Sequence, residues 1–505
     1  MNALSTLPLM IPLAGAAAAL AVSRHVALQR IIALLSGAAL LAVATGLLIE
    51  AWGHPSVLIT LGGWEQPFGI NLRVDALSAV LVFLTALLGL AVLWFSDYDI
   101  DQPRRHWGYY PLVLFMLMGV CGAFLTSDIF NLYVWFEVIL ASSFVLITLG
   151  SERPQLRGGI SYVALNILGS VMFLIAVGLI YGGTRTLELE ELAVRLAELR
   201  ELSPGLVLSI QALLLTAFAV KAAMFPLFYW LPASYHTPPP VISALFAGLL
   251  TKVGVYAMMR IIFGVFPLEP SVYTILAIGA SLTMITGVFG ALSQMDVRRI
   301  LLVHIVSQIG YLIAGVALAG NVPPEQQVVA LTAGIFYTVH IIIVKTNLLL
   351  ISGIILRREG SEAIKDLGGL AKHMPWLGIM FILSALSLAG LPPFSGFWAK
   401  LSIIDAALEV ENLVVAVFAV TTGLFTLMSM MKIWTGVFWG VRPETAPADP
   451  PRTPAAFAVP VVLLTFVTVA VGLFPQPLFD LSEQAARQLV DMSQLAAHAG
   501  SEVSP

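Results

Sequence analysis

Runs of about 20 apolar residues recur along almost the whole chain, and this pattern constrains the fold more than any other feature. A soluble chain of 505 residues needs many charged side chains to cover its surface, whereas here 59% of the residues are hydrophobic and 11% are charged. The pattern predicts an all-α polytopic membrane protein. The N-terminus lacks the basic segment of a cleaved signal peptide, so we expect the first apolar run to stay as a membrane helix.

A hydropathy window of about 19 residues indicates about fourteen transmembrane helices. The candidate spans are 4–22, 31–50, 72–95, 109–127, 130–149, 158–182, 206–231, 238–263, 271–292, 299–319, 328–356, 376–408, 411–440 and 457–475. The longest charged connection, 183–205, has leucines among many Glu and Arg residues, which predicts an amphipathic surface helix. This helix would serve equally well as a solvated connector or as a contact for a partner.

The distribution of lysine and arginine predicts the orientation. With the N-terminus outside, most of the 25 basic residues fall in cytoplasmic loops, as the positive-inside rule requires. Arg260 is among the few on the outer side in this assignment. We therefore expect a multi-pass protein of the bacterial cytoplasmic (inner) membrane with both termini on the outer side.

Five charged residues lie deep within the apolar spans. They are Glu137, Lys221, Lys252, Lys345 and Lys400. A charge near the middle of a membrane helix costs roughly 2.5 to 3.5 kcal/mol, so a set of this kind indicates an interior polar route for protons or cations. Lys432 also falls within a span, but towards its cytoplasmic end, where a lysine can extend to the interface.

Two spans are interrupted by proline, one over 221–232 and the other over 390–396. Proline removes a backbone donor, and in lipid the freed carbonyl groups need protein or water partners. Each interruption lies within ten residues of a lysine, which favours broken helices beside a hydrated cavity over simple kinks. The breaks fall in the seventh and twelfth spans, five spans apart, which fits a repeat of five helices. Because five is an odd number, the second copy of the repeat would cross the membrane in the opposite orientation to the first.

This reasoning divides the chain into four parts. They are 1–108 with helices 1–3, 109–263 as the first five-helix repeat, 271–440 as the second, inverted repeat, and 441–505 as the last helix and tail.

Several segments resemble a known family. The run from Phe124 to Glu137, the Lys221–Pro226 and Trp230–Pro232 segments, His236-Thr-Pro-Pro-Pro240 and Gly248-Leu-Leu-Thr-Lys252-Val-Gly254 are similar to the antiporter-like proton-channel subunits. This family includes the large membrane-arm subunits of respiratory complex I and the A-type and D-type subunits of the Mrp-type multisubunit sodium/proton antiporter. Within it, the first run and the run that follows Tyr235 most resemble the D-type subunits.

The resemblance implies a role for each candidate residue. Glu137 would be the acidic partner of Lys221, Lys252 the central relay, Lys345 a connecting relay and Lys400 the terminal proton site. It also implies that His236 helps to open a path to the cytoplasm and that His304 and His340 bridge between lysines. A lone histidine on an apolar helix is more often a hydrogen-bonded packing residue, and that interpretation stays open for both.

Elementary acid–base chemistry agrees with a relay. A lysine in water has a pKa near 10.4 and holds its proton too tightly to pass it on at pH 7. Burial in general lowers the pKa of an amine by up to 3 to 5 units, and a neighbouring carboxylate opposes this effect. A static buried ion pair between Glu137 and Lys221 is the alternative, and its loss on mutation would not by itself demonstrate transport.

Signatures of other chemistry are not found in the sequence. There is no Walker A loop, no dinucleotide fingerprint and no His and carboxylate set with zinc-ligand spacing, and Cys121 is the single cysteine. We expect no cofactor and no metal site. The energy for transport would then come from an ion gradient or from partner subunits.

The favoured function is therefore the proton-translocating subunit of a hetero-oligomeric Na⁺/H⁺ antiporter driven by the proton-motive force. The alternative is a proton-pumping subunit of a redox complex, either complex I or a membrane-bound hydrogenase. A non-transporting membrane protein, such as an acyl-group enzyme, is the third class. The sequence does not identify the exported cation, the stoichiometry or the direction of proton flow in each half.

Overall fold

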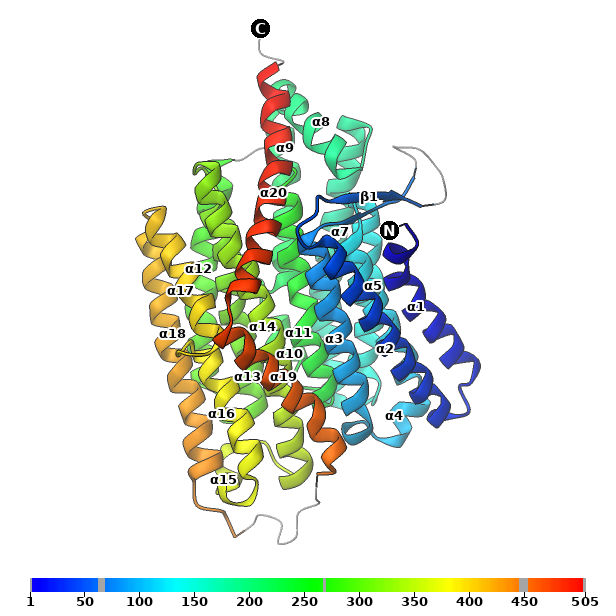
Figure 1. Ribbon diagram of the computed structural model, residues 1–505, viewed down its shortest axis with the longest axis vertical. Helices are drawn as coiled ribbons and strands as arrows, with labels where there is room; N and C mark the ends of the chain where they lie inside the picture. Colours follow the sequence, from blue (N-terminus) through cyan, green and yellow to red (C-terminus); the bar gives the residue numbers. More distant parts are fainter. Residues whose placement is uncertain (1, 62–68, 267–268, 445–452, 503–505) are drawn as a thin grey trace.

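The computed structural model describes residues 2–61, 69–266, 269–444 and 453–502, and most of them are helical (Figure 1). Twelve helices in these ranges are long and apolar enough to cross a membrane. They are α1 (Asn2–Ala21), α2 (Val26–Ala51), α3 (Ala76–Asp99), α6 (Ile129–Thr148), α7 (Arg153–Thr184), α9 (Pro204–Ala222), α11 (Pro240–Ala257) continued by the π-helix η1 (Met258–Phe263), α12 (Pro270–Leu292), α13 (Val297–Leu318), α14 (Pro324–Glu359), α18 (Leu413–Ile433) continued by the π-helix η3 (Trp434–Trp439), and α19 (Ala455–Leu473).

The remaining elements are shorter or more polar. They are β1 (Val57–Thr60), β2 (Asn71–Val74), α4 (Gln102–His106), α5 (Tyr109–Leu125), α8 (Leu189–Leu202), α10 (Trp230–Ser234), the 3-10 helix η2 (Ile364–Asp366), α15 (Leu370–His373), α16 (Pro375–Ala389), α17 (Ser395–Glu409) and α20 (Gln476–Glu502). The predicted spans 109–127 and 376–408 correspond to α5 and to the pair α16 and α17. The division into two inverted repeats stays a prediction.

The bundle has two different ends (Figure 1). The antiparallel pair β1–β2, α8 and the C-terminal half of α20 lie at one, which we call the hairpin end. The short helices α4 and α15 lie at the other, which we call the α4 end. α1 begins and α20 finishes towards the hairpin end, so both termini of the described chain lie on the same side.

Local sequence chemistry explains where many helices begin. Asp75 caps α3 by accepting a hydrogen bond from the backbone N–H of Ser78, whose hydroxyl accepts from the N–H of Asp75 in return. Asp128 and Glu188 cap α6 and α8 in a similar way. Proline occupies the first turn of α7, α9, α11, α12, α14 and α16, where no N–H partner is lost.

Both predicted helix breaks are present. α9 ends at Ala222, Ala223 adopts a left-handed conformation with φ 60°, and helix resumes only at α10. α16 ends at Ala389, and Gly390 with φ 90° turns the chain before α17 begins at Ser395. Glycine adopts this conformation without strain, which explains the sharp stop in the second break.

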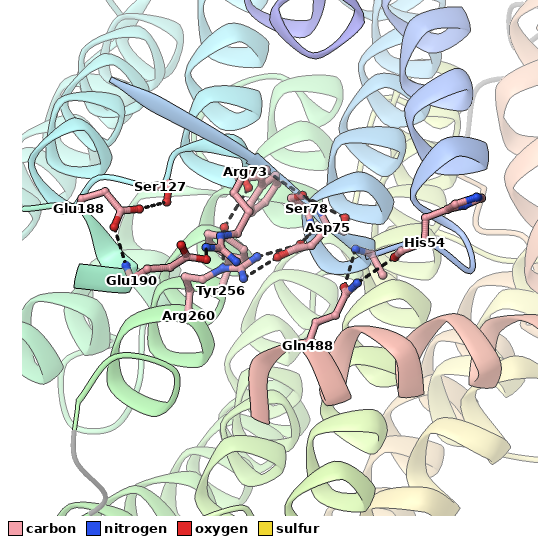
Figure 2. A network of polar contacts seen from close by, with 12 residues as sticks. His54, Arg73, Asp75, Ser78, Ser127, Glu188, Glu190, Tyr256, Arg260 and Gln488 are labelled. Carbon is pink, nitrogen blue, oxygen red and sulfur yellow. Dashed lines mark hydrogen bonds and ion pairs between the residues drawn. The ribbon is translucent and has the colours of Figure 1, made fainter. Parts of the chain in front are cut away.

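The hairpin end is held together by a buried polar network (Figure 2). Arg260 on η1 donates to both carboxylate oxygens of Asp75, at 2.6 and 2.9 Å, and also to the hydroxyl of Tyr256 at 3.2 Å. Arg73 on β2 pairs with Glu190 at the start of α8. These contacts attach the hairpin and α8 to the end of the helix that carries Lys252.

Three features differ from the sequence-based expectation. The span predicted to start at residue 72 starts at Ala76, because residues 71–74 form β2. Arg260, counted among the outer-side charges although it falls within the predicted span 238–263, is 2% exposed and paired inside the bundle. α20 was not predicted; it packs against α14, α8 and α3. The amphipathic helix expected within 183–205 is α8, and its Leu192 and Leu196 are fully buried.

Candidate functional site

Glu137 and Lys221 lie near the first helix break. Glu137 is midway along α6, and Lys221 is in the last turn of α9. No hydrogen bond or ion pair joins them in the described structure, and one carboxylate oxygen of Glu137 is buried without a partner. Glu137 is nevertheless close enough to attract Lys221 electrostatically, and the Lys221 Nζ lies 5.6 Å from the centre of the Phe136 ring.

A small cavity adjoins Lys221. Its volume is about 20 Å³, which is room for one water molecule. Tyr162 and Asn166 of α7 and Trp230 of α10 line it together with apolar side chains of α11. The carbonyl of Val220, in the last turn before the break, accepts from the Trp230 indole N–H at 2.9 Å and from the backbone N–H of Ala223 at 3.1 Å.

Lys252 lies on α11 and is 1% exposed. Its amine donates to the carbonyl of Ala247 in the same helix at 2.5 Å, and no carboxylate of the described residues lies within 4.0 Å of it. Two residues further on, a Cβ at Gly254 would lie 2.6 Å from the backbone nitrogen of Ala222. This glycine therefore lets the helix of Lys252 pack directly against the first break.

Lys345 on α14 is completely buried. Its amine donates to the carbonyl of Leu301 on α13 at 2.9 Å. Lys252 and Lys400 are both close enough to repel Lys345 electrostatically when all are charged. The three amines therefore form a coupled series across α11, α14 and α17, in which the charge on one affects proton binding by the next.

Lys400 lies on α17 directly after the second break and is 6% exposed. Its amine donates to the carbonyl of Ala389 at 2.8 Å and lies 5.4 Å from the centre of the Tyr311 ring. A Cβ at Gly390 would lie 2.6 Å from the Lys400 side chain, so this glycine leaves space for the lysine. A cavity of about 220 Å³ between α16, α17 and α18 borders the amine.

The two histidines of the second half belong to polar chains between the lysines. His304 on α13 is fully buried, and its Nδ1 lies 3.2 Å from the Ser307 hydroxyl. Gln308 donates to that hydroxyl at 2.9 Å and accepts from the Tyr337 hydroxyl. The Tyr337 ring stacks on Tyr311, which faces Lys400.

His340 on α14 is 1% exposed and faces the second break. Its Nδ1 lies 2.8 Å from the Ser395 hydroxyl at the start of α17, and that hydroxyl lies 3.1 Å from the Ser387 hydroxyl on α16. The Nε2 atoms of His340 and His304 are both buried without a partner in the described structure. Each ring thus has one nitrogen fixed and one available to a water or a proton.

His236 lies apart from this series, between α10 and α11 at the α4 end. Its Nδ1 lies 2.8 Å from the carbonyl of Pro232. Partial burial lowers the pKa of His236 below its usual value, while the hydrogen bond to Pro232 opposes that change. The side chain is placed where the first break meets the solvent at this end.

The polar side chains that connect the charged residues were not identified from the sequence. Tyr162, Gln308, Tyr311 and Tyr337 come from three different helices, and only folding brings them beside Lys221 and Lys400. The sequence does contain one signal that could identify such residues, namely uncharged polar residues at a regular spacing within an apolar span. No group of three His, Cys, Asp or Glu side chains that could hold a metal ion occurs in the described ranges.

Comparison with known proteins agrees with this arrangement. Residues 126–426 match the family model described as NADH:quinone oxidoreductase/Mrp antiporter, TM. The chain is 40% identical to the D-type subunit of a Na⁺/H⁺ antiporter from Alkalihalophilus pseudofirmus over 492 residues, which covers 97% of this chain and 98% of the relative.

Two solved structures extend the comparison. A chain in the structure of the Mrp complex from Dietzia sp. DQ12-45-1b superimposes with a TM-score of 0.89 at 34% identity, covering 99% of this chain and 100% of that one. A chain of the membrane-bound sulfane sulfur reductase, an archaeal respiratory membrane complex, gives a TM-score of 0.89 at 26% identity, covering 99% of this chain and 100% of that one. The protein is therefore a multi-pass membrane protein that belongs to the NADH:quinone oxidoreductase/Mrp antiporter transmembrane family.

Proposed function

We propose that this chain is the proton-translocating subunit of a multisubunit monovalent cation (Na⁺)/H⁺ antiporter driven by the proton-motive force. The observation that carries the proposal is the series of buried amines Lys252, Lys345 and Lys400, each bonded to a backbone carbonyl and none paired with a carboxylate in the described structure. A buried amine without a counter-ion loses and regains a proton at low cost. The name of the Alkalihalophilus relative supports the Na⁺/H⁺ activity and the need for other subunits as partners.

In this proposal the proton passes along the series that joins Lys400, Lys345 and Lys252 to Lys221 and Glu137, and it leaves towards the cytoplasm from Lys221 and Glu137. His304 and His340 bridge the steps nearest Lys400, because one ring nitrogen of each is buried without a partner in the described structure. His236 controls access at the α4 end. Each lysine passes on its proton only when its neighbour is neutral, since adjacent charges repel one another.

The α4 end would face the cytoplasm of a bacterium and the hairpin end the outside. Arg104, Arg298 and Arg357 gather at the α4 end, which supports this orientation by the positive-inside rule. Both termini would then lie on the outer side of the inner membrane. Cysteine variants of Arg357 and Arg185 in a Cys121→Ala background test it, because an impermeant thiol reagent should label only the first in everted vesicles.

A redox complex is the second candidate, favoured by the match to the archaeal respiratory membrane complex. In that setting electron transfer in other subunits would drive the same amine series. Neighbouring genes for small antiporter subunits or for redox subunits would discriminate between the two settings.

The deciding experiment is sodium-dependent dissipation of a pH gradient in everted vesicles from antiporter-deficient cells that express the chain with its neighbouring gene products. The variants are Glu137→Ala, Lys221→Ala and, as a control lysine outside the series, Lys432→Met. Pulldown checks assembly of each variant. We expect exchange in the wild type and in Lys432→Met only. An assembled wild type without cation-dependent exchange would overturn the antiporter proposal and leave redox-linked pumping.

A further inference from the structure

A polar vestibule opens at the α4 end, below the start of α11. Its volume is about 360 Å³, and Asp99, Arg104, Glu152, Gln155, Arg298 and Arg357 contribute to its walls. An Asp99 carboxylate oxygen accepts a hydrogen bond from the backbone N–H of Val241 in the first turn of α11, at 2.7 Å. The vestibule is thus a space lined by charges of both signs, where ions and water can collect.

Gln155 forms the inner wall of this vestibule. The side chain is only 1% exposed, and its carbonyl oxygen is buried without a hydrogen-bond partner in the described structure. Its amide nitrogen lies 3.4 Å from the carbonyl of Thr237. An unpartnered buried carbonyl costs free energy unless water reaches it, which indicates that water penetrates beyond the open mouth.

Gln155 begins a polar stripe along α7. Gln155, Tyr162, Asn166 and Ser170 are spaced seven, four and four residues apart, so they occupy one face of the helix. They are 1%, 3%, 2% and 4% exposed, whereas apolar residues on other faces of the same helix, such as Leu168, lie on the surface. α7 therefore turns its polar face inwards and its apolar face towards the membrane.

The stripe leads from the vestibule to the cavity beside Lys221. Gln155 lines the vestibule, while Tyr162 and Asn166 line the cavity. Seven residues of α-helix separate Gln155 from Tyr162, a rise of about 10 Å. The packing is close between them: a Cβ at Gly158 would lie 3.0 Å from the Thr237 hydroxyl.

Several hydroxyl groups lie beside the inner part of this polar stripe. The Tyr162 hydroxyl lies 2.7 Å from the Ser143 hydroxyl on α6, the helix that carries Glu137, and Glu137 is close enough to act on Tyr162 electrostatically. The Tyr235 hydroxyl is buried without a partner in the described structure, and its ring contacts Trp230, which in turn contacts Tyr162. Gln155, Tyr235 and Glu137 each have a buried polar atom without a partner among the described residues, and a single water could bind at each of these atoms.

We propose that the polar face of α7 is the proton exit route from Glu137 and Lys221 to the vestibule, with the Tyr162 hydroxyl as its transfer group. The inference rests on the proposed function. Tyr162 stays neutral overall: its hydroxyl gives a proton to a water on the vestibule side and receives another from the direction of Glu137. One proton reaches the vestibule for each proton that leaves the carboxylate.

Tyr162→Phe tests the route, because it removes the hydroxyl and keeps the ring. Tyr109→Phe is the matched control, since Tyr109 is equally buried and its hydroxyl lies 2.6 Å from the Ser96 hydroxyl, away from Lys221. In assembled complexes we expect Tyr162→Phe to lower the maximal exchange rate about 100-fold, the lower end of what a positioned proton-transfer group contributes. The sodium concentration for half-maximal exchange should not change, and the solvent deuterium isotope effect should rise.

Gln155→Leu and Gln155→Asn give a second test at the vestibule. Leucine closes the route to water and should lower exchange, whereas asparagine keeps a polar wall and should retain most of it. If the Tyr162→Phe and Tyr109→Phe complexes assemble equally and exchange at the same rate, the route along α7 is wrong, but the antiporter function still stands. A wild-type complex without cation-dependent exchange would instead overturn the proposed function, and the route with it.

Discussion

Two basic residues of the same helical segment have opposite surroundings. Lys252 and Arg260 are separated by eight residues on α11 and η1 and are 1% and 2% exposed. Arg260 binds both oxygens of Asp75 and the hydroxyl of Tyr256 (Figure 2). Lys252 binds a single backbone carbonyl, that of Ala247, among the described residues.

This difference separates a structural charge from a transferable one. A guanidinium with a bidentate carboxylate keeps its proton at every pH at which the protein is folded. A buried amine held only by a carbonyl has no counter-ion that fixes its charge, so its proton can leave and return. Burial alone therefore does not mark a relay residue; burial together with the absence of a carboxylate partner does.

The largest effect is expected from Asp75→Asn. Asparagine can still cap α3, but it leaves the Arg260 guanidinium buried without a counter-charge. Removing one partner of a buried ion pair costs about 3 to 5 kcal/mol, so the folded complex should lose most of its thermal stability. The midpoint of heat-induced unfolding of the purified complex, followed by size-exclusion chromatography, measures this change.

The double variant Asp75→Asn with Arg260→Met is the control for that prediction. It removes the unpaired charge, and we expect it to recover much of the lost stability. If the double variant melts as low as Asp75→Asn, the loss comes from packing at the hairpin end and not from an unpaired guanidinium.

Lys252→Met should have the next largest effect, on transport and not on folding. Methionine fills the same space and removes an amine that no carboxylate in the described structure needs, so the unfolding midpoint should stay the same or rise. Exchange should fall by at least about 100-fold, because the central proton carrier is lost. Both quantities can be measured on the same purified and reconstituted complex.

Lys252→Arg sharpens the test. The guanidinium is permanently charged and would be buried without a counter-ion, so this variant should lose both exchange and stability. If the unfolding midpoint of Lys252→Met falls as far as that of Asp75→Asn, then the Lys252 amine stabilises the fold as Arg260 does. The distinction between the two residues would then be wrong.

The sequence was sufficient to predict the helical membrane fold, both helix breaks and the charged residues within the spans. These features are local: an apolar run, a proline or Gly390 beside Lys400 can each be recognised without knowing what packs against it. The pairing of Arg260 with Asp75 was not predicted, because it depends on a residue far away in the sequence.

Other features could not be found in this way. α20 buries Leu481, Ala485 and Leu489 on one side and exposes polar residues on the other, so a hydropathy average over all its residues does not detect it. β1 and β2 are only four residues each. The separation of Glu137 from Lys221 and the ring of Tyr311 above Lys400 depend on how helices rotate against one another, which periodicity in a membrane span does not fix.

Tyr311→Leu should have an intermediate effect. The ring of Tyr311 faces the Lys400 amine, and a cation–π contact of this kind contributes about 0.5 to 2 kcal/mol to the charged form. Its loss should slow exchange by roughly tenfold. Tyr311→Phe keeps the ring and loses only the hydrogen bond to the carbonyl of Ala419, so exchange should stay near that of the wild type. Equal exchange by the two variants would mean that the ring does not act on the amine.

Lys432→Met should have the smallest effect, although Lys432 also donates to backbone carbonyls within a membrane span. Its acceptors are Leu292 at 3.0 Å and Gln294 at 2.6 Å, at the C-terminal end of α12, where the carbonyl groups have no partner in the helix. A lysine there stabilises the helix end by about 0.3 to 1 kcal/mol, so the unfolding midpoint should fall slightly and exchange should not change.

The acceptors of Lys252 and Lys345 differ from those of Lys432 in one respect. Ala247 and Leu301 lie inside α11 and α13, whose own hydrogen-bond ladders already use these carbonyls. The fold therefore does not require either amine, whereas α12 makes use of Lys432. A Lys432→Met complex that assembles but has lost exchange would contradict this distinction, because a lysine that completes a helix end would then also be carrying protons.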